Sequence, residues 1–276
     1  MEPVLTLSDL DNWSFPGTAL AVLGHPIKHS ISPQMHNSAL ATMGQTDAAF
    51  DSWRYFRFDV PPADLPEALT KLHAAGFLGL NLTVPHKVLA FDLIEHVDPS
   101  AQPIGAVNTL KRTATGWHGH NTDGYGLATA VAETLVECLA QGCASLHIAN
   151  RTEANRVTLI ADLAPLDRDI PVAGFAPSDP PHNLPPNALV INATSAGLKP
   201  EDPLPIDLAT ITSPLAVFDM IYNPAETKLL TAAKSRGIPT ANGLSMLVHQ
   251  GACALEIWSE AQVPVSVMHT AVKQSA

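Results

Sequence analysis

Short apolar runs alternate with amphipathic stretches along the first half of the chain. The predicted strands, which are rich in aliphatic and aromatic residues, are Ala19–Leu23, Phe50–Phe58, Gly79–Val84 and Val107–Lys111. The predicted helices between them are Pro33–Met43, Pro62–Ala75 and Lys87–Glu95. This alternation is typical of an α/β domain with a mostly parallel sheet.

A second α/β series begins after Asp123. Its predicted strands are Ser145–Ala149, Ala188–Ile191 and Ala216–Asp219. The proline-rich stretches 176–186 and 199–205 are expected to be loops. Near the end of the chain, Ser245–Trp258 is apolar at helical spacing, whereas residues 1–18 favour a weakly structured extension.

Composition narrows the class of protein. The chain has 276 residues, 46% of them hydrophobic, and a formal net charge of −11, which disfavours a nucleic acid or an anionic membrane as partner. No apolar run reaches the roughly 18 residues of a membrane span, and the acidic N-terminus lacks the basic start of a signal peptide. Cys138, Cys143 and Cys253 form no CxxC pair, so we expect a reduced, cytoplasmic protein.

The first candidate for chemistry is Lys87, which closes the stretch NLTVPHK. Read as a strand, this stretch turns Leu80, Leu82 and Val84 to one face and its polar residues to the other, and Pro85 ends the strand pairing. A lysine at such a strand-to-helix junction can serve as a proton shuttle. The alternative is an ordinary surface lysine at the start of a helix.

Two more polar segments contain candidate residues. In GHPIKHSISPQMHN, Ser30 and Ser32 lie two apart in an extended segment, so both hydroxyls can face one side and bind a carboxylate. Ser32 followed by Pro33 also reads as a helix N-cap. In GHNTDG, Asp123 stands at the start of another predicted helix, where an aspartate is most often a cap.

The chain resembles the shikimate dehydrogenase family in eight segments that occur in the family's order. They are GHPIKHSISPQMHN, NLTVPHK, GAVNT, NTDG, NRT at 150–152, INATSAGL at 191–198, VFDMIYNP at 217–224 and NGLSMLVHQGA at 242–252. The resemblance implies a parallel-sheet substrate-binding domain at 19–123 and 244–276, preceded by an extension at 1–18. It also implies a Rossmann-like NADP-binding domain at 124–243.

The second domain departs from the family pattern. The family places a buried strand and a glycine-rich turn of the type GAGGAxxA after NTDG, and that turn holds the cofactor pyrophosphate at a helix N-terminus. Here no glycine cluster occurs between Gly126 and Gly142, so a strand and loop of roughly twenty residues are missing. Tyr125–Gln141 is predicted to be one continuous helix that ends at Gly142. Cofactor binding is then either weakened or lost, or restored by rearrangement, including exchange between subunits.

The resemblance assigns roles to individual residues. Lys87 would exchange the hydroxyl proton of the substrate, and Asp123 would orient it. The residues implied to bind the substrate carboxylate or ring hydroxyls are Ser30, Ser32, Asn81, Thr83, Asn108, Tyr222 and Gln250. The residues implied to contact NADP are Asn150, Arg151, Thr152, Thr194, Ser195, Met220 and Gly243. Singly, each has a structural alternative, such as a helix cap for Asn150 or a turn for Tyr222.

The implied activity is the NADP-dependent reversible reduction of 3-dehydroshikimate to shikimate in aromatic amino-acid biosynthesis. Quinate is an alternative substrate, and a monomer or a homodimer is expected. A second class stays open, namely a non-catalytic or weakly active relative that binds a shikimate-like or quinate-like ligand but holds the cofactor poorly.

Twelve histidines raise the question of a metal site, above all His118 and His120, which lie two apart. In a strand both rings face one side. Since no cysteine or acidic pair follows nearby in the sequence to complete a tetrahedral set, the sequence predicts no metal site.

Overall fold

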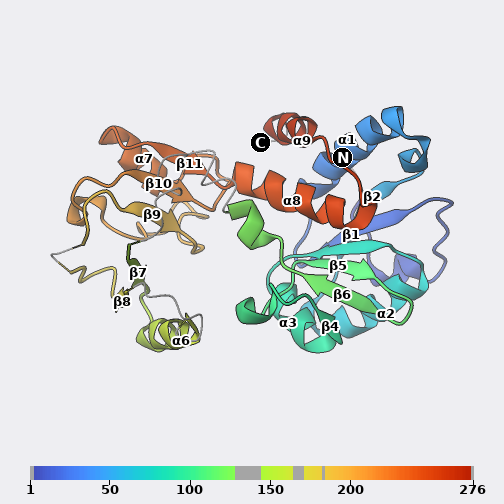
Figure 1. The fold of residues 1–276 in the computed structure, drawn as a ribbon, viewed down its shortest axis with the longest axis horizontal. Coiled ribbons are helices and arrows are strands. Elements are labelled where there is room, and N and C mark those ends of the chain that lie inside the picture. The colour runs from blue at the N-terminus through green and yellow to red at the C-terminus, as the bar shows by residue number, and fades with distance from the viewer. Residues whose placement is uncertain (1–2, 128–143, 164–170, 182–183, 275–276) are drawn as a thin grey trace. The chain divides into compact units, whose positions relative to one another are not determined.

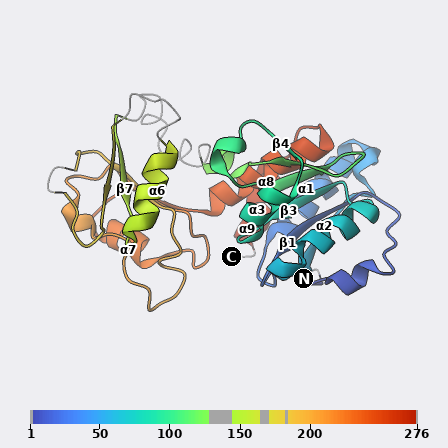
Figure 2. The same cartoon turned by 90° about the horizontal axis from the view of Figure 1, so that it is seen from below.

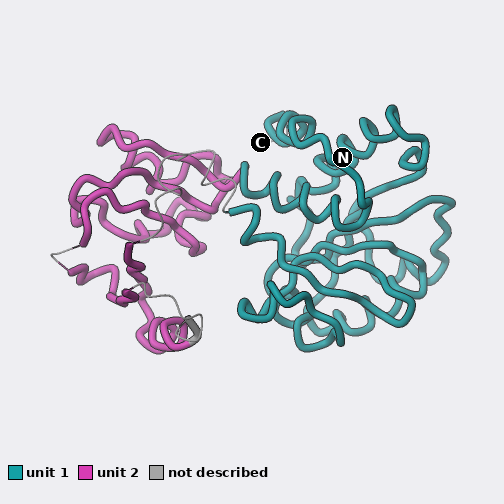
Figure 3. The backbone as a smooth tube through the Cα atoms, viewed as in Figure 1, with its two compact units in different colours: residues 1–127, 245–276 teal, residues 128–244 magenta. Residues whose placement is uncertain are grey.

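The computed structural model describes residues 3–127, 144–163, 171–181 and 184–274. The chain divides into two compact units (Figure 3). Unit 1 comprises residues 1–127 and 245–276, and unit 2 comprises residues 128–244. Among the described helices, none combines the length and the apolar composition needed to cross a bilayer.

Unit 1 contains a six-stranded mixed sheet. Its strands are β1 (Ala19–Gly24), β2 (Arg54–Asp59), β3 (Gly79–Leu82), β4 (His96–Val97), β5 (Thr109–Arg112) and β6 (Trp117–His120), in the order β2-β1-β3-β5-β6-β4. β1 pairs in parallel with β2 and β3, and β4 pairs in parallel with β6. β5 is antiparallel to both of its neighbours, which the prediction of a mostly parallel sheet did not anticipate. The α/β class itself is confirmed.

Helices cover both faces of this sheet (Figures 1 and 2). The helices of unit 1 are α1 (Ser32–Thr46), α2 (Leu65–Ala74), α3 (His86–Leu93), α8 (Leu244–Ser259) and α9 (Val265–Lys273). α2 and α3 lie on one face, over a core that includes Leu69, Leu72 and Leu80, and α1, α8 and α9 lie on the other. A Cβ on Gly79 would come within 2.2 Å of the Trp258 indole, so α8 packs closely on β3.

Several predicted boundaries were wrong by a few residues. Phe50 belongs to a 3-10 turn (Ala48–Phe50), and the strand begins only at Arg54. β3 ends at Leu82 because Pro85 cannot continue the pairing, and Val84 is therefore 75% exposed rather than buried. Ser32 is the first residue of α1 rather than its cap.

The N-terminal residues are more ordered than predicted. The amide of Leu5 donates to Arg57 O at 3.0 Å, and Leu5 O accepts from the amide of Asp59 at 2.7 Å, so this segment pairs with the edge strand β2. A 3-10 helix (Leu7–Leu10) follows, and the ring of Trp13 packs 4.9 Å from that of Phe77. Apolar contacts therefore hold this segment on unit 1, although its sequence favoured a weakly structured extension.

The described residues of unit 2 form five parallel strands in two separate sheets. β7 (Leu146–Ala149) pairs with β8 (Val172–Phe175), and the other sheet, in the order β11-β10-β9, contains β9 (Leu189–Asn192), β10 (Ala216–Asp219) and β11 (Thr240–Asn242). The helices described in this unit are α6 (Glu153–Leu163) and α7 (Lys228–Ser235), with a 3-10 turn at Leu208–Thr210. β8 and β11 had no counterpart in the prediction.

Within the described residues of unit 2, the order of the strands corresponds to that of a doubly wound sheet without its central strand. The doubly wound order is 3-2-1-4-5-6, and β8, β7, β9, β10 and β11 take the places of 3, 2, 4, 5 and 6. In the described part of the chain, no strand occupies position 1 of this order, so β7 and β9 are edge strands. Leu146 and Ile191 on these edges are 39% and 42% exposed. Residues 123–127 are helical, and the remainder of the predicted helix Tyr125–Gln141 lies outside the described residues.

Candidate active site

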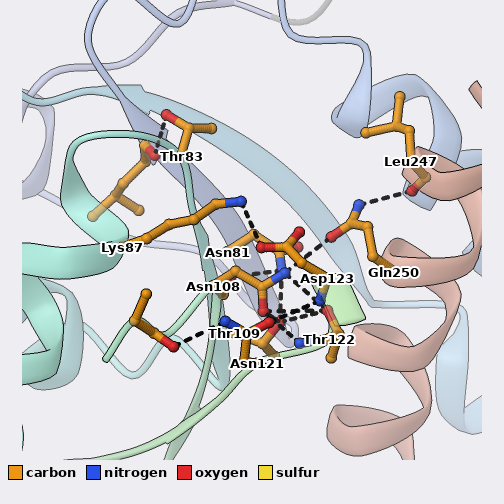
Figure 4. A network of polar contacts seen from close by, with 12 residues as sticks. Asn81, Thr83, Lys87, Asn108, Thr109, Asn121, Thr122, Asp123, Leu247 and Gln250 are labelled. Carbon is orange, nitrogen blue, oxygen red and sulfur yellow. Dashed lines mark hydrogen bonds and ion pairs between the residues drawn. The ribbon is translucent and has the colours of Figure 1, made fainter. Parts of the chain in front are cut away.

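Lys87 and Asp123 form an ion pair in unit 1 (Figure 4). Lys87 lies in the first turn of α3, and Asp123 begins the helical residues that follow β6. Lys87 Nζ donates to Asp123 Oδ2 at 2.7 Å, and the two side chains are only 24% and 26% exposed. The Asp123 amide is bonded at 3.0 Å to Asn121 Oδ1, which leaves the Asp123 carboxylate available to the lysine. Partial burial strengthens this attraction relative to a surface pair.

Asn108 is the centre of the polar network beside this pair. Its Oδ1 accepts from the Thr122 amide at 2.8 Å, and its Nδ2 donates to Thr122 Oγ1 at 2.9 Å. Nδ2 also reaches Gln250 Oε1 on α8 at 3.4 Å, and Gln250 Nε2 is bonded to Leu247 O at 2.7 Å (Figure 4). The network thus joins the residue before β5, the segment after β6 and α8, and it fixes the residue that precedes Asp123.

Asn81 is held by a second layer of contacts. Its Nδ2 donates to Asn108 O and to Thr109 Oγ1, and its Oδ1 accepts from the Tyr55 hydroxyl at 2.7 Å. The ring of Tyr55 stacks on His36 with centroids 4.0 Å apart, and His36 bonds the carbonyls of Ser32 and Gly251. Burial lowers the pKa of His36 to about 4, against the opposing effect of those two carbonyls, and burial also raises the pKa of Tyr55.

The two candidate serines lie at the start of α1. The Ser32 amide donates to Ser30 Oγ at 3.4 Å, and both residues are half-buried. Arg57 on β2 donates to Lys28 O at 2.8 Å and to Ser30 O at 3.3 Å, which ties their loop to the sheet. Thr83 Oγ1 donates to Leu23 O at 3.4 Å. Hydrogen bonds therefore join Lys87 to Asp123, and Asn108 to Asn81 and Gln250, whereas the hydroxyls of Ser30, Ser32 and Thr83 take no part in these two sets of contacts.

Unit 2 has its own cavity, of about 770 Å³, between the edge strands β7 and β9. Five of the seven residues expected to contact NADP line it, namely Asn150, Arg151, Thr152, Thr194 and Ser195. They follow the carboxyl ends of β7 and β9, where ligands bind in open α/β sheets. Arg151 is exposed, and Asn150 Oδ1 accepts from the Thr152 amide at 2.9 Å in an Asx turn.

A buried set of hydrogen bonds shapes the loop that follows β9. Asn192 Nδ2 donates to Asp219 Oδ1 at 3.0 Å, and Asn192 Oδ1 accepts from the amide and the hydroxyl of Thr194. Asp219 Oδ2 accepts from Thr227 Oγ1 at 2.6 Å. The fully buried Asp219 carboxylate thereby holds Asn192, which in turn fixes the loop that carries Thr194 and Ser195.

The other two residues expected to contact NADP lie together elsewhere in unit 2. A Cβ on Gly243 would lie 1.9 Å from Met220 O, so only glycine permits this approach of two backbones. Tyr222 belongs to this unit too, and burial raises the pKa of its hydroxyl.

The donor set around the cavity suits a phosphate-bearing nucleotide. An exposed guanidinium beside hydroxyl and amide groups can bind a phosphate through several charge-assisted hydrogen bonds. The residues present therefore fit the adenosine end of NADP. A glycine-rich pyrophosphate turn is missing from the sequence between Gly126 and Gly142.

Sequence reasoning missed several residues of the site. Tyr55, His36 and the pair Asn192–Asp219 position the candidate residues without being named as candidates. Thr109 and Thr122 stood inside the quoted GAVNT and NTDG motifs, so a signal for them existed. No sequence signal pointed to Tyr55, because its contact with Asn81 depends on the pairing of β1 with β2 and β3.

Comparisons with known proteins agree with this geometry. Residues 22–110 match the family model of the shikimate dehydrogenase substrate binding domain, and residues 243–273 match that of the shikimate 5'-dehydrogenase C-terminal domain. The NADP(+) shikimate dehydrogenase of Symbiobacterium thermophilum is 37% identical, over 93% of this chain and 94% of its own. The chain belongs to the shikimate dehydrogenase family.

Other members of the family support the same conclusion. The NADP(+) shikimate dehydrogenase of Moorella thermoacetica is 38% identical over 93% of this chain and 92% of its own. The crystal structure of the Aquifex aeolicus shikimate dehydrogenase matches 95% of this chain and 99% of its own with a TM-score of 0.80 at 29% identity. The Thermus thermophilus shikimate 5-dehydrogenase in complex with NADP(H) and shikimate matches 94% of this chain and 100% of its own with a TM-score of 0.73 at 30% identity.

The alignments also reveal a difference in length within the family. The alignment with the Symbiobacterium enzyme runs over 281 positions, whereas 93% of this 276-residue chain is about 257 residues. Roughly two dozen positions of that relative therefore have no counterpart here, which is the length of a strand with its turn and part of a helix. This length agrees with that of the strand and glycine-rich turn expected between Gly126 and Gly142 from the sequence.

Proposed function

We propose that this protein catalyses the NADP-dependent reversible reduction of 3-dehydroshikimate to shikimate, a step of aromatic amino-acid biosynthesis. The observation that carries the proposal is the half-buried Lys87–Asp123 pair beside a network of neutral polar side chains. Relatives that cover nearly the whole chain are named for this reaction.

The proton transfer is assigned to Lys87. In the reductive direction its ammonium donates a proton to the carbonyl oxygen of the substrate, and in the oxidative direction the neutral amine takes the proton of the secondary hydroxyl. Asp123 holds Nζ at 2.7 Å and so fixes the direction from which the proton is delivered. NADP, when bound, supplies the hydride acceptor or donor.

Substrate recognition is assigned to neutral groups. Asn81, Asn108, Gln250 and Thr83 suit the ring hydroxyls, because amides and hydroxyls give or take hydrogen bonds without the desolvation cost of a charge. Ser30 and Ser32 would supply hydroxyls for the substrate carboxylate, and the Tyr222 hydroxyl is a further candidate for the same group. Quinate, which carries the same kinds of group, is the second substrate to examine.

Cofactor recognition is assigned to unit 2. Arg151, with Asn150 and Thr152, would hold the 2′-phosphate of NADP, since a guanidinium fork matches phosphate geometry. Thr194, Ser195, Met220 and Gly243 would lie along the nicotinamide half. A monomer or a homodimer is compatible with these assignments.

The direct test is shikimate-dependent formation of NADPH, followed by absorbance. Wild type is compared with Lys87→Ala and with Lys71→Ala, a lysine of the same unit whose ion pairs with Asp11 and Glu67 lie on the surface. We expect activity in wild type and in Lys71→Ala, and loss in Lys87→Ala. Parallel reactions with quinate and with NAD define the preferred substrate and cofactor.

Calorimetry distinguishes a failure to bind shikimate from a failure to bind NADP. If shikimate binds but wild type does not turn over, and NADP binding is undetectable, the protein is a ligand-binding member of the family and the catalytic proposal is wrong. Equal activity in Lys87→Ala and wild type would refute the role of Lys87.

A further inference from the structure

A cluster of histidines and one carboxylate lies at the edge of the unit 1 sheet, apart from the Lys87–Asp123 pair. β4 pairs in parallel with β6, so that His96 is the partner of His118 and Val97 is the partner of Gly119. The Asp98 amide then donates to Gly119 O at 2.8 Å, which extends the register and places Asp98 beside His120. Because side chains alternate across a strand, these four residues share one face.

The distances show that the side chains converge. His120 Nδ1 lies 3.7 Å from Asp98 Oδ2, and the rings of His118 and His120 have centroids 4.4 Å apart. One potential ligand atom from each of Asp98, His118 and His120 lies within 4.8 Å of the others, and all three residues are half-buried. Three donors at this spacing can converge on a single ion by small side-chain rotations.

Two further observations concern how the donors are presented. Asp98 Oδ1 accepts from both the amide and the hydroxyl of Ser100, which fixes the carboxylate and leaves Oδ2 toward His120. His120 Nε2 is buried and has no hydrogen-bond partner among the described residues. No hydrogen bond of the His120 ring therefore has to break when the ring turns to present either nitrogen to an ion.

The charge around the cluster also permits a cation. Lys111 is the cross-strand partner of His118, but its Nζ is bonded at 2.6 Å to Glu260, which offsets its charge.

We propose that Asp98, His118 and His120 form a binding site for a divalent transition metal, with Zn²⁺ as the ion that fits best. Two imidazoles and one carboxylate are an established zinc ligand set, and water or His96 from the same face completes the tetrahedron. The sequence predicted no metal site because Asp98 lies twenty residues before His118, and only the β4–β6 pairing supplies the acidic partner.

The metal would have a structural role, joining two strands, and would take no part in the reaction. β4 has only two residues and lies at the edge of the sheet, and a metal would join it to β6. β6 leads directly into Thr122 and Asp123, and the Asn108 amide is bonded to His120 O at 3.0 Å. Metal binding would therefore stabilise the strand that positions one member of the catalytic pair.

The test uses the full chain after removal of metals with a chelator. Co²⁺ is titrated while visible absorbance is followed, and Zn²⁺ is titrated by calorimetry. The variants are Asp98→Asn, His118→Ala and His96→Ala, with His147→Ala as the matched control, because His147 is a half-buried strand histidine of unit 2. Tryptophan fluorescence, to which Trp117 on β6 contributes, checks that each variant is folded.

The expected result is one equivalent of metal bound by wild type and by His147→Ala, with intense visible bands for Co²⁺ in tetrahedral coordination. Asp98→Asn and His118→Ala should each weaken binding at least thirtyfold, and His96→Ala decides whether three or four side chains ligate. Zn²⁺ should also raise the melting temperature of wild type but not that of Asp98→Asn. Binding that is unaffected by Asp98→Asn and His118→Ala, or no binding at one hundred micromolar Zn²⁺, would overturn the proposal.

Discussion

The two units share an alternation of strands and helices but differ in whether their sheets are continuous. In unit 1, β1 and β3 are buried along their whole length, as expected of central strands with helices on both faces. Of the strands described in unit 2, β10 alone is buried throughout, and β7 and β9 have half-exposed and exposed residues. Among the described residues, no strand pairs with the second edge of β7 or of β9, and the cavity lies between these two strands.

This difference separates two halves of the chemistry. The residues assigned to the proton transfer, Lys87 and Asp123, lie in unit 1, where they are bonded to each other at 2.7 Å. The residues assigned to the cofactor lie on loops around the open cavity. A protein can keep a preorganised substrate site while its cofactor site loses part of its backbone donors, because the two sites depend on different sheets.

The largest effect is expected from Asp123→Asn, which keeps the shape of the side chain and removes its charge. Lys87 would lose the partner that orients it, and kcat should fall roughly 10²- to 10³-fold, in the range typical of positioned acid–base groups. Calorimetry should show shikimate affinity within a few-fold of wild type. A variant with wild-type kcat would show that the 2.7 Å contact has no role in turnover.

Restoring the missing strand should have the next largest effect. A segment comprising an apolar strand and a GAGGAxxA turn, inserted after Thr134, should raise NADP affinity about a hundredfold, since it adds several backbone donors to phosphate. A glycine–serine insert of equal length is the control. Equal NADP affinity for the two inserts, measured by calorimetry, would show that the missing strand does not limit cofactor binding.

A smaller effect concerns the stability of unit 1 at mildly acidic pH. The folded-state pKa of His36 is about 4, whereas the free side chain titrates near 6.5, so the unfolded chain binds more protons between these values. Stability is thus fully present above pH 6.5 and is lost as pH falls toward 4, with a loss of about 1.5 kcal/mol between pH 6.5 and 5.

Tryptophan fluorescence can isolate this effect, because Trp13, Trp53, Trp117 and Trp258 all lie in unit 1. Urea unfolding of wild type and His36→Gln at several pH values gives the difference in slope. His36→Gln should be less stable at pH 7 but less sensitive to acid. Parallel pH dependences for the two proteins would contradict the assignment to His36.

The smallest predicted effect is that of Arg151→Ala. Since Arg151 is exposed, its contact with a 2′-phosphate is screened by water, and we expect the preference for NADP over NAD to fall about fivefold. Arg236→Ala, which alters another exposed arginine of unit 2, provides the control. An unchanged preference in Arg151→Ala would mean that the NRT segment does not read the 2′-phosphate.

Several features of this protein could be predicted from the sequence alone. The α/β class and the family follow from apolar periodicity and from eight motifs in order, and the prediction of a missing strand rests on the absence of a glycine cluster between Gly126 and Gly142. These features are local, so neighbouring residues suffice to reveal them. The Lys87 and Asp123 candidates were found in the same way.

Tertiary structure decided the features that depend on strands distant in sequence. Because β5 is antiparallel to β3, Asn108 and Thr109 lie beside Asn81. Because β1 pairs with β2, Tyr55 on β2 reaches the same side chain. Likewise, the β4–β6 register places Asp98 beside His120. Which side chains share a face is set by strand register, and a register is fixed only when the whole sheet buries its apolar faces.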